Sequence, residues 1–281
     1  MSTSKKTPTS KEPKSLEPSR DFGGVQSQGG RPYQEDSFGF SSFDNGDGAT
    51  EGLLMVLADG MGGYVGGKRA SATAVETFID VLRHTRKSPS NHRLGTALHA
   101  ANRAIAEAIA LAPRKFASMG TTLVAAAIVG GSIEWISVGD SPLYLWRKGK
   151  LRRLNEDHSL APYLKRQVKQ GGMSESEALA HPEKNMLLSA LTGEKLQLID
   201  WPEDALKLSG GDVIVMASDG LNTLSDESIA TILQKSAKED AETVARNLVD
   251  AVLAAGKYRQ DNVTVLAVRV PRQGAGCRGR I

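Results

Sequence analysis

The feature that most constrains the fold is a series of apolar runs with almost no chain between them. Residues 121–130, 133–138 and 143–147 are predicted strands, because each run is short, apolar and bounded by Gly, Ser, Pro or charged residues. Parallel neighbours need a crossover of about a dozen residues or more. These strands therefore pair antiparallel, which predicts an α+β fold rather than a doubly wound sheet.

The rest of the chain supplies further strands and several amphipathic helices. Additional strands are predicted at 53–58, 213–217 and 263–270, and helical spacing of apolar residues occurs at 70–83, 94–112 and 240–255. A polar insert near 160–195 is expected to be helical, and is either a mobile lid or a plain surface insert.

Composition excludes several classes of protein. The run 123–131, made of hydrophobic residues and Gly, is far shorter than the roughly 18 residues needed to span a bilayer, so a transmembrane protein is excluded. The single cysteine, Cys277, excludes an internal disulfide framework and a thiolate zinc cluster. It fits a reducing compartment.

The net charge of +3 is carried by the two ends of the chain. Residues 1–20 are rich in Ser, Thr, Lys and Pro and are predicted to be a disordered basic tail. Residues 271–281 are expected to be a second flexible tail. Because the central span is acidic, we predict no nucleic-acid partner. No hydrophobic signal segment precedes the domain, so a cytoplasmic location is expected.

Acidic residues stand where the predicted strands begin or end. They are Glu35, Asp36, Asp59, Asp140, Asp219 and Asp261. A single aspartate at such a place is usually part of a turn or a helix cap. Several at one sheet edge would repel one another unless a cation lay among them, and no comparable set of Lys or Arg accompanies them. Oxygen ligands favour Mg or Mn over Zn or Cu.

A metal pair in such a cluster would suit phosphoryl chemistry. Two ions roughly 3.5–4 Å apart can activate a water and neutralise a phosphoryl group. Arg31, four residues before Glu35, could make a bidentate phosphate contact.

Seven short motifs occur in a fixed order along the chain. They are RPYQED at 31–36, ADGMGG at 58–63, MGTTL at 119–123, VGDSPLY at 138–144, EDHSL at 156–160, GDVIVMASDGL at 211–221 and DNVTVLAV at 261–268. Together they resemble the metal-dependent PP2C (PPM) family of protein serine/threonine phosphatases, in its bacterial form. The resemblance covers about residues 22–270, and HPEKNMLLSAL at 181–191 resembles the family's flap segment.

The resemblance implies a four-layer α-β-β-α sandwich of two antiparallel sheets flanked by helix pairs. It implies a phosphatase domain at 21–270 with a flap insert at about 160–195. The implied reaction is hydrolysis of phosphoserine and phosphothreonine by direct attack of a metal-bridging water, without a phosphoenzyme. Two Mn²⁺ or Mg²⁺ ions, with a third at a weaker site, are the implied cofactors. The implied partners are phosphorylated proteins and a cognate Ser/Thr kinase, with no membrane and a monomeric chain.

The resemblance also implies roles for the residues of the first metal site. Asp59 would bridge the two metals, and the backbone carbonyl of Gly60 would hold one of them. Asp219 and Asp261 would complete that site.

The remaining roles concern the other ions and the substrate. Asp36, with Glu35 beside it, would complete the second site directly or through waters. Asp140 together with Asp219 matches the third, weaker site, and Arg31 matches the phosphate-binding arginine.

Three positions depart from the family pattern. Met61 stands where eukaryotic relatives carry a histidine thought to be the general acid, which leaves that role open to a metal-bound water. Pro142 replaces the usual arginine after VGDS, and Ser189 replaces a basic residue of the flap, which would alter substrate docking.

His158, flanked by Asp157 and Ser159, is interpreted as structural rather than catalytic.

Two other functions compete with this hypothesis. Residues 62–68, GGYVGGK, satisfy the P-loop spacing, but Arg69 stands where that motif needs Ser or Thr for Mg²⁺. A catalytically inactive phosphoprotein-binding module, a pseudophosphatase, is the second alternative. Such modules typically lose metal-site carboxylates, and those implied here are all present.

Overall fold

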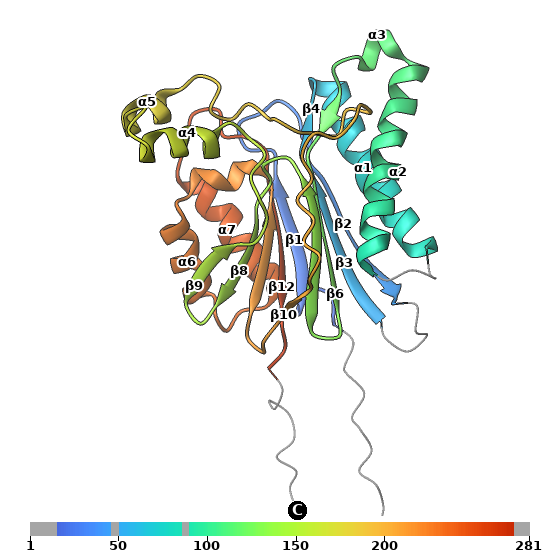
Figure 1. Ribbon diagram of the computed structural model, residues 1–281. Helices are drawn as coiled ribbons and strands as arrows, with labels where there is room; N and C mark the ends of the chain where they lie inside the picture. Colours follow the sequence, from blue (N-terminus) through green and yellow to red (C-terminus); the bar gives the residue numbers. More distant parts are fainter. Residues whose placement is uncertain (1–15, 46–50, 86–89, 273–281) are drawn as a thin grey trace, which may run out of the picture.

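The computed structural model of the 281-residue chain describes residues 16–45, 51–85 and 90–272. Its core is a pair of five-stranded antiparallel sheets (Figure 1). The first sheet has the order β1 (Phe22–Ser27), β12 (Val263–Arg269), β11 (Val213–Ala217), β8 (Leu143–Arg147) and β9 (Lys150–Arg153). The second has the order β10 (Leu206–Lys207), β7 (Ser132–Val138), β6 (Leu123–Val129), β3 (Glu51–Ala58) and β2 (Ser37–Asp44). The short strands β4 (Gly60–Met61) and β5 (Gly120–Thr121) pair separately.

Helices cover the outer face of each sheet, as Figure 1 shows. The second sheet is covered by α1 (Tyr64–His84) and α2 (Ser90–Leu111), and the short α3 (Pro113–Phe116) follows them. The first sheet is covered by α6 (Asp226–Lys235) and α7 (Ala241–Ala254), which follow the 3₁₀ turn η1 (Asp219–Thr223). The predicted four-layer α-β-β-α sandwich is therefore confirmed.

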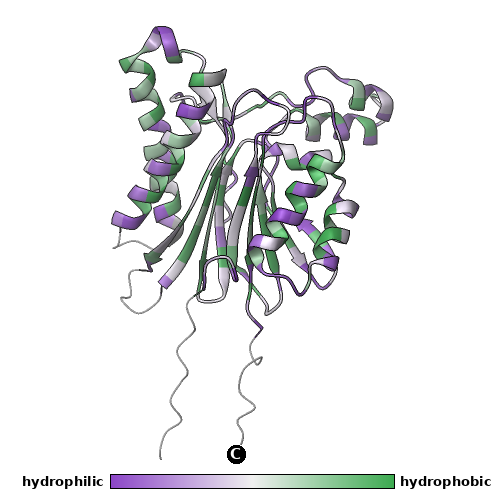
Figure 2. Cartoon of the chain, turned by 180° about the vertical axis from the view of Figure 1, so that it is seen from behind, coloured by the Kyte–Doolittle hydropathy of each residue, from purple (hydrophilic) through white to green (hydrophobic). Residues whose placement is uncertain are grey.

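Three apolar clusters hold the four layers together. One lies between the sheets, where Met55 and Leu57 of β3 meet Leu145 of β8 and Met216 of β11. The other two lie between each sheet and its helices. The strands are largely hydrophobic in Figure 2. Because β3 has neighbours on both faces, its run of apolar residues is uninterrupted rather than alternating.

The sheet register brings the predicted acidic positions to one end of the sandwich. Asp36 precedes β2 and Asp59 follows β3, and the strands pair through Ser37 opposite Ala58. In the other sheet Asp219 follows β11 and Asp261 precedes β12, and those strands pair antiparallel. A strand that ends and an antiparallel neighbour that begins share the same edge.

The structure differs from the sequence prediction in several elements, among them the strands β1, β9 and β10, which were not predicted. The predicted strand 121–130 is interrupted at Thr122, whose side chain accepts a hydrogen bond from the backbone N–H of Asp59 (3.0 Å). Within the predicted helical insert only α4 (Ala161–Lys169) and α5 (Glu175–Ala180) are helical. The helix α6 was not predicted, because its apolar positions are few and alternate with charged and polar residues.

The end of the predicted N-terminal tail contacts the domain. The carbonyls of Ser19 and Arg20 accept hydrogen bonds from the backbone N–H groups of Glu242 (3.0 Å) and Ala241 (3.0 Å) at the start of α7. Residues 1–15 and 273–281 of the two predicted tails lie outside the described residues. Among the helices that the structure describes, none combines the length and apolar character needed to cross a bilayer.

Candidate metal centre

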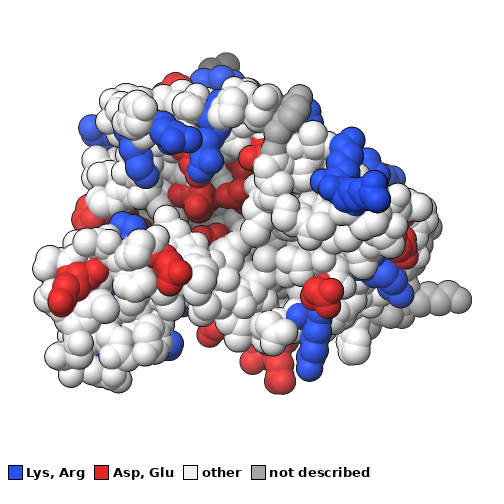
Figure 3. Space-filling model, turned by 90° about the horizontal axis from the view of Figure 1, so that it is seen from above, with Lys and Arg blue, Asp and Glu red and all other residues white. Residues whose placement is uncertain are grey.

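Loops at one end of the two sheets place the acidic side chains in a hollow. Seen from above, Figure 3 shows carboxylates gathered at the bottom of this hollow and basic side chains along part of its border. Of the sequence-predicted residues, Asp36 and Asp140 are buried, with relative exposures of 5% and 9%. The remaining acids, Glu35, Asp59, Asp219 and Asp261, are partly exposed.

Burial and mutual repulsion together raise the pKa values of this cluster. Burial, followed by repulsion from Asp36 and Asp219, raises the pKa of Asp59 well above its ordinary value. Burial and the neighbouring carboxylates Asp140 and Asp261 raise the pKa of Asp219 to about 7. Without a cation the cluster therefore holds its negative charge poorly near neutral pH.

Two buried hydroxyls fix the orientation of Asp36. Ser218 Oγ and Thr264 Oγ1 both donate to Asp36 Oδ2, at 2.8 Å and 2.6 Å. Burial raises the pKa of Asp36 to about 6, and the two hydrogen bonds oppose that shift. The other carboxylate oxygen, Asp36 Oδ1, is buried and has no hydrogen-bond partner.

Glu35 lies in a narrow space against the first turn of α1. A Cβ at Gly67 would collide with Glu35 Oε1, and a Cβ at Gly60 would collide with the carbonyl of Gly67, so only glycine fits at either place. Glu35 Oε1 is buried without a hydrogen-bond partner. Burial raises the pKa of Glu35, and Arg31 opposes the shift.

Arg31 reaches the cluster through Asp261. Its Nη2 atom lies 2.6 Å from Asp261 Oδ2, and both side chains are partly exposed at 44% and 38%. The charges of Asp219 and Glu35 also favour the protonated form of Arg31 and so raise its pKa. Arg31 is therefore a cation at the border of the acidic cluster, within reach of a phosphoryl group placed there.

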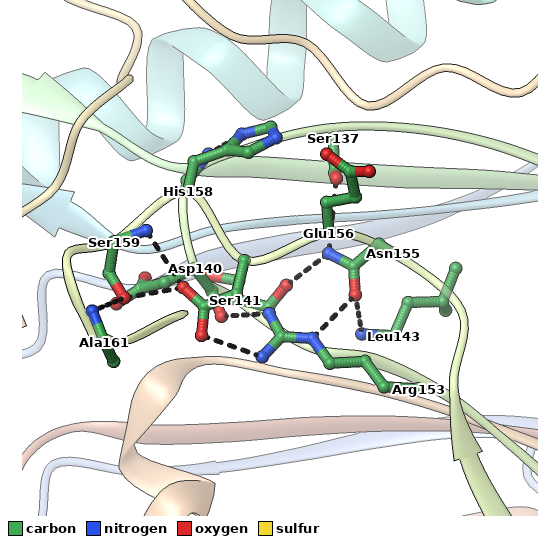
Figure 4. Close-up of polar contacts among 12 residues, drawn as sticks. Ser137, Asp140, Ser141, Leu143, Arg153, Asn155, Glu156, His158, Ser159 and Ala161 are labelled. Atoms are coloured by element: carbon green, nitrogen blue, oxygen red, sulfur yellow. Dashed lines mark hydrogen bonds and ion pairs between the residues drawn. The ribbon is translucent and has the colours of Figure 1, made fainter. Parts of the chain in front are cut away.

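Asp140 is held by the segment that leads into the insert (Figure 4). Arg153 donates from Nη2 to the backbone carbonyl of Asp140 (2.8 Å) and from Nη1 to Asp157 Oδ2 (3.2 Å). Asn155 Oδ1 accepts a hydrogen bond from the backbone N–H of Leu143, just after the same turn (2.8 Å). Burial and the charge of Asp157 raise the pKa of Asp140 to about 6, which Arg153 opposes.

His158 supports this turn instead of facing a reacting group. The ring atom Nδ1 of His158 accepts a hydrogen bond from the backbone N–H of Gly139 (3.2 Å). The backbone N–H of His158 donates to the Gly139 carbonyl (3.1 Å). Burial lowers its pKa, so the ring is neutral at pH 7. These contacts support the structural interpretation of His158.

The P-loop alternative does not fit the geometry. Residues 64–68 of the GGYVGGK motif already form the first turns of α1, so they do not curl into an open anion cradle. Gly66 and Gly67 instead pack against Met119 and Glu35.

The donor set fits a hard divalent cation. Two buried carboxylate oxygens, Asp36 Oδ1 and Glu35 Oε1, lack a partner, and all candidate donors are oxygens. Over residues 16–45, 51–85 and 90–272, no three His, Cys, Asp or Glu side chains already stand in a closed metal-binding arrangement. Asp261 is turned toward Arg31, so the carboxylates must reorient to close around an ion.

Sequence reasoning missed the residues that support these acids. Ser218 and Thr264 hold Asp36. Asn262 Oδ1 accepts a hydrogen bond from the backbone N–H of Glu35 (2.8 Å). The side-chain amide of Asn262 donates to the carbonyls of Gln28 and Tyr33 (both 2.9 Å). All three are adjacent to, or within three residues of, a predicted acid. That proximity in sequence was the available signal.

Fold and site together define a class: double-sheet sandwiches with an acidic, metal-type centre at one end. Comparisons with known proteins narrow this class. The family model described as protein phosphatase 2C matches residues 26–255. The chain belongs to the protein phosphatase 2C family.

Relatives with curated names support this family assignment. The chain is 32% identical over 242 residues to the serine/threonine phosphatase stp of Listeria monocytogenes, covering 85% of this chain and 90% of that protein. It is 33% identical over 218 residues to the serine/threonine protein phosphatase PstP of Mycobacterium tuberculosis, covering 77% of this chain. The match spans only 40% of the length of PstP.

Solved structures show the same fold. The serine/threonine phosphatase of S. agalactiae aligns with a TM-score of 0.73 and 30% identity over 89% of this chain and 99% of that one. The catalytic domain of PstP in complex with two manganese ions aligns with a TM-score of 0.70 and 29% identity, covering 89% and 97% of the two chains.

Proposed function

We propose that this chain is a metal-dependent protein serine/threonine phosphatase that hydrolyses phosphoserine and phosphothreonine in proteins. The observation that carries the proposal is the acidic cluster, in which buried carboxylate oxygens lack partners and repulsion raises the pKa values of Asp59 and Asp219. Its support from relatives is that stp and PstP are named serine/threonine phosphatases.

Mn²⁺ or Mg²⁺ is the proposed cofactor. Asp59 would bridge two ions, with Gly60, Asp219 and Asp261 completing one site and Asp36 and Glu35 the other. A third ion would sit at Asp140 and Asp219. When bound, the ions would supply an activated water nucleophile and neutralise charge on the phosphoryl group. The PstP structure with two manganese ions supports the pair.

The chain's own residues bind and orient the substrate. Arg31 would exchange its contact with Asp261 for the phosphoryl oxygens, and its planar guanidinium suits bidentate binding. Ser218 and Thr264 would keep Asp36 in one orientation, and Arg153 would hold the turn that carries Asp140. Met61 has no ionisable group, so it cannot protonate the leaving alkoxide.

The wider setting of this function is also a proposal. The catalytic domain would span residues 21–270, with the insert at 160–195 as its flap. The protein would act in the cytoplasm as a monomer, on substrates of a cognate Ser/Thr kinase.

Phosphate release from a phosphothreonine peptide tests this function. We expect release with Mn²⁺, none with excess chelator, and little from the matching phosphotyrosine peptide. A folded protein that binds the phosphothreonine peptide without hydrolysing it under any metal would establish the pseudophosphatase alternative instead.

A further inference from the structure

A basic loop borders the acidic hollow. Lys257, Tyr258 and Arg259 lie between α7 and β12 and are exposed to solvent, Tyr258 to 89%. We call these three residues the 257–259 loop. Within the described parts of the chain, neither Lys257 nor Arg259 forms a salt bridge.

The loop packs on the turn that carries Arg31. The backbone N–H of Gly30 donates to the carbonyl of Gln260 (2.8 Å), and a Cβ at Gly30 would lie 3.1 Å from the Cα of Arg259. Since consecutive Cα atoms are about 3.8 Å apart, the Cα of Arg259 lies within about 8 Å of the Cα of Asp261. The loop is therefore next to the Arg31–Asp261 pair.

The structure holds this loop in a defined conformation. Gln260 is 5% exposed, and its amide accepts from Thr223 (2.8 Å) and donates to the carbonyl of Gly220 (3.3 Å). Arg259 has a φ of 56°, a left-handed conformation that side chains other than glycine rarely adopt. Such a conformation persists only where the surroundings enforce it.

Charge complementarity indicates what this loop binds. The hollow itself is acidic and suits cations, whereas the 257–259 loop adds two cations and an exposed aromatic ring beside Arg31. In Figure 3 basic side chains line one margin of the hollow. Two exposed cations beside Arg31 complement negative charge, so an anionic peptide segment is the matching occupant.

We propose that Lys257 and Arg259 recognise a second anionic group, phosphoryl or carboxylate, one to three residues from the phosphoamino acid that is hydrolysed. The proposal rests on the phosphatase function above. Two residues of an extended peptide span about 7 Å, comparable with the limit of about 8 Å between the Cα atoms of Arg259 and Asp261. The enzyme would then prefer multiply phosphorylated or acidic segments.

Three phosphothreonine peptides test the proposal. They carry Gln, Glu or a non-hydrolysable phosphonate two residues after the phosphothreonine, so each contains one scissile phosphate. The kcat/KM of each is measured with Mn²⁺ for the wild type, for Lys257→Gln/Arg259→Gln and for Lys148→Gln. Lys148 is a matched control, because it is exposed, has a φ of 51° and lies at the far end of β8.

The wild type should prefer both anionic peptides over the Gln peptide. In the double variant, the ratio of kcat/KM for an anionic peptide to that for the Gln peptide should fall about fivefold, since two exposed ion pairs contribute roughly that much. Its kcat/KM for the Gln peptide should not change. Lys148→Gln should behave as wild type. The phosphonate and Glu arms separate a phosphoryl-specific from a general anion preference.

Three results would overturn the inference. Equal rates of the wild type on all three peptides would show that no second anion is recognised. An equal loss of rate on all peptides in the double variant would show only general attraction of phosphate. Absence of hydrolysis of even the Gln peptide would refute the phosphatase function itself and the inference with it.

Discussion

Removing the hydroxyl of Thr264 should weaken metal binding without unfolding the protein. Thr264 Oγ1 donates to Asp36 Oδ2 at 2.6 Å, both residues are buried, and the opposite oxygen Oδ1 is the one left without a partner. Thr264→Val keeps the shape of the side chain and deletes this hydrogen bond.

The expected size of the effect follows from the bond that is lost. A hydrogen bond to a charged group contributes about 1.5–3 kcal/mol. Because this bond is already present without metal, its effect on binding comes from orienting Asp36, and loss of such an orienting partner typically lowers metal affinity about 10- to 100-fold. Ser218→Ala should act in the same direction, with some loss of stability, because Ser218 Oγ also accepts the backbone N–H of Thr264 (2.9 Å).

Calorimetric titration with Mn²⁺ measures this directly. Thr264→Ser keeps a hydroxyl and should retain most of the affinity. Ser236→Ala deletes a buried hydroxyl that hydrogen-bonds Asn247 Nδ2 (3.0 Å) and should leave the affinity unchanged. If folded Thr264→Val binds Mn²⁺ within twofold of the wild type, the reasoning about Asp36 is wrong.

Three further perturbations follow from the site. Folding raises the pKa of Asp219 to about 7, so the native state binds more protons than the unfolded chain between about pH 4 and 7. The metal-free protein should therefore lose stability as the pH rises through that window. Urea unfolding with chelator should show this slope, and Asp219→Asn should reduce it. Arg31→Ala should raise KM for a phosphopeptide. It should not lower Mn²⁺ affinity, because it removes a cation that competes for Asp261. Steady-state kinetics and Mn²⁺ titration check both expectations, and loss of metal binding would contradict them. Gly67→Ala should lower Mn²⁺ affinity, because the added Cβ would displace Glu35 Oε1. Gly66→Ala is the control and should have a smaller effect, since its Cβ would lie 3.1 Å from Met119 Cβ. Equal Mn²⁺ affinities of the two variants would argue against a role for Glu35.

Much of the fold could be predicted because the strands are marked by local signals. Runs such as 213–217 and 263–270 are short and apolar, and turn residues bound them. The break at Thr122 could not be predicted, because it arises from a hydrogen bond to Asp59, more than 60 residues away in sequence. The helix α6 escaped prediction because only Ile229 and Leu233 of its residues are buried, with Ile232 partly buried against the same core.

The candidate site was only partly predictable. Antiparallel pairing brings Asp36 to Asp59 in one sheet and Asp219 to Asp261 in the other, and the packing of the two sheets then brings the two pairs together. The contact of Arg31 with Asp261 and the support of Asp36 by Thr264 join residues about 230 positions apart. Such contacts depend on the tertiary fold and have no local signature.

The most direct test of the central claim is a paired measurement on Asp59→Asn. Because Asp59 lies among carboxylates that repel it, this variant should be at least as stable as the wild type without metal, yet it should lose Mn²⁺ binding and phosphothreonine hydrolysis together. Mn²⁺ titration, phosphate release and urea unfolding are measured on the same preparation. A folded Asp59→Asn that binds Mn²⁺ and hydrolyses the peptide as the wild type does would contradict the assignment of this acidic cluster as the metal-dependent active site.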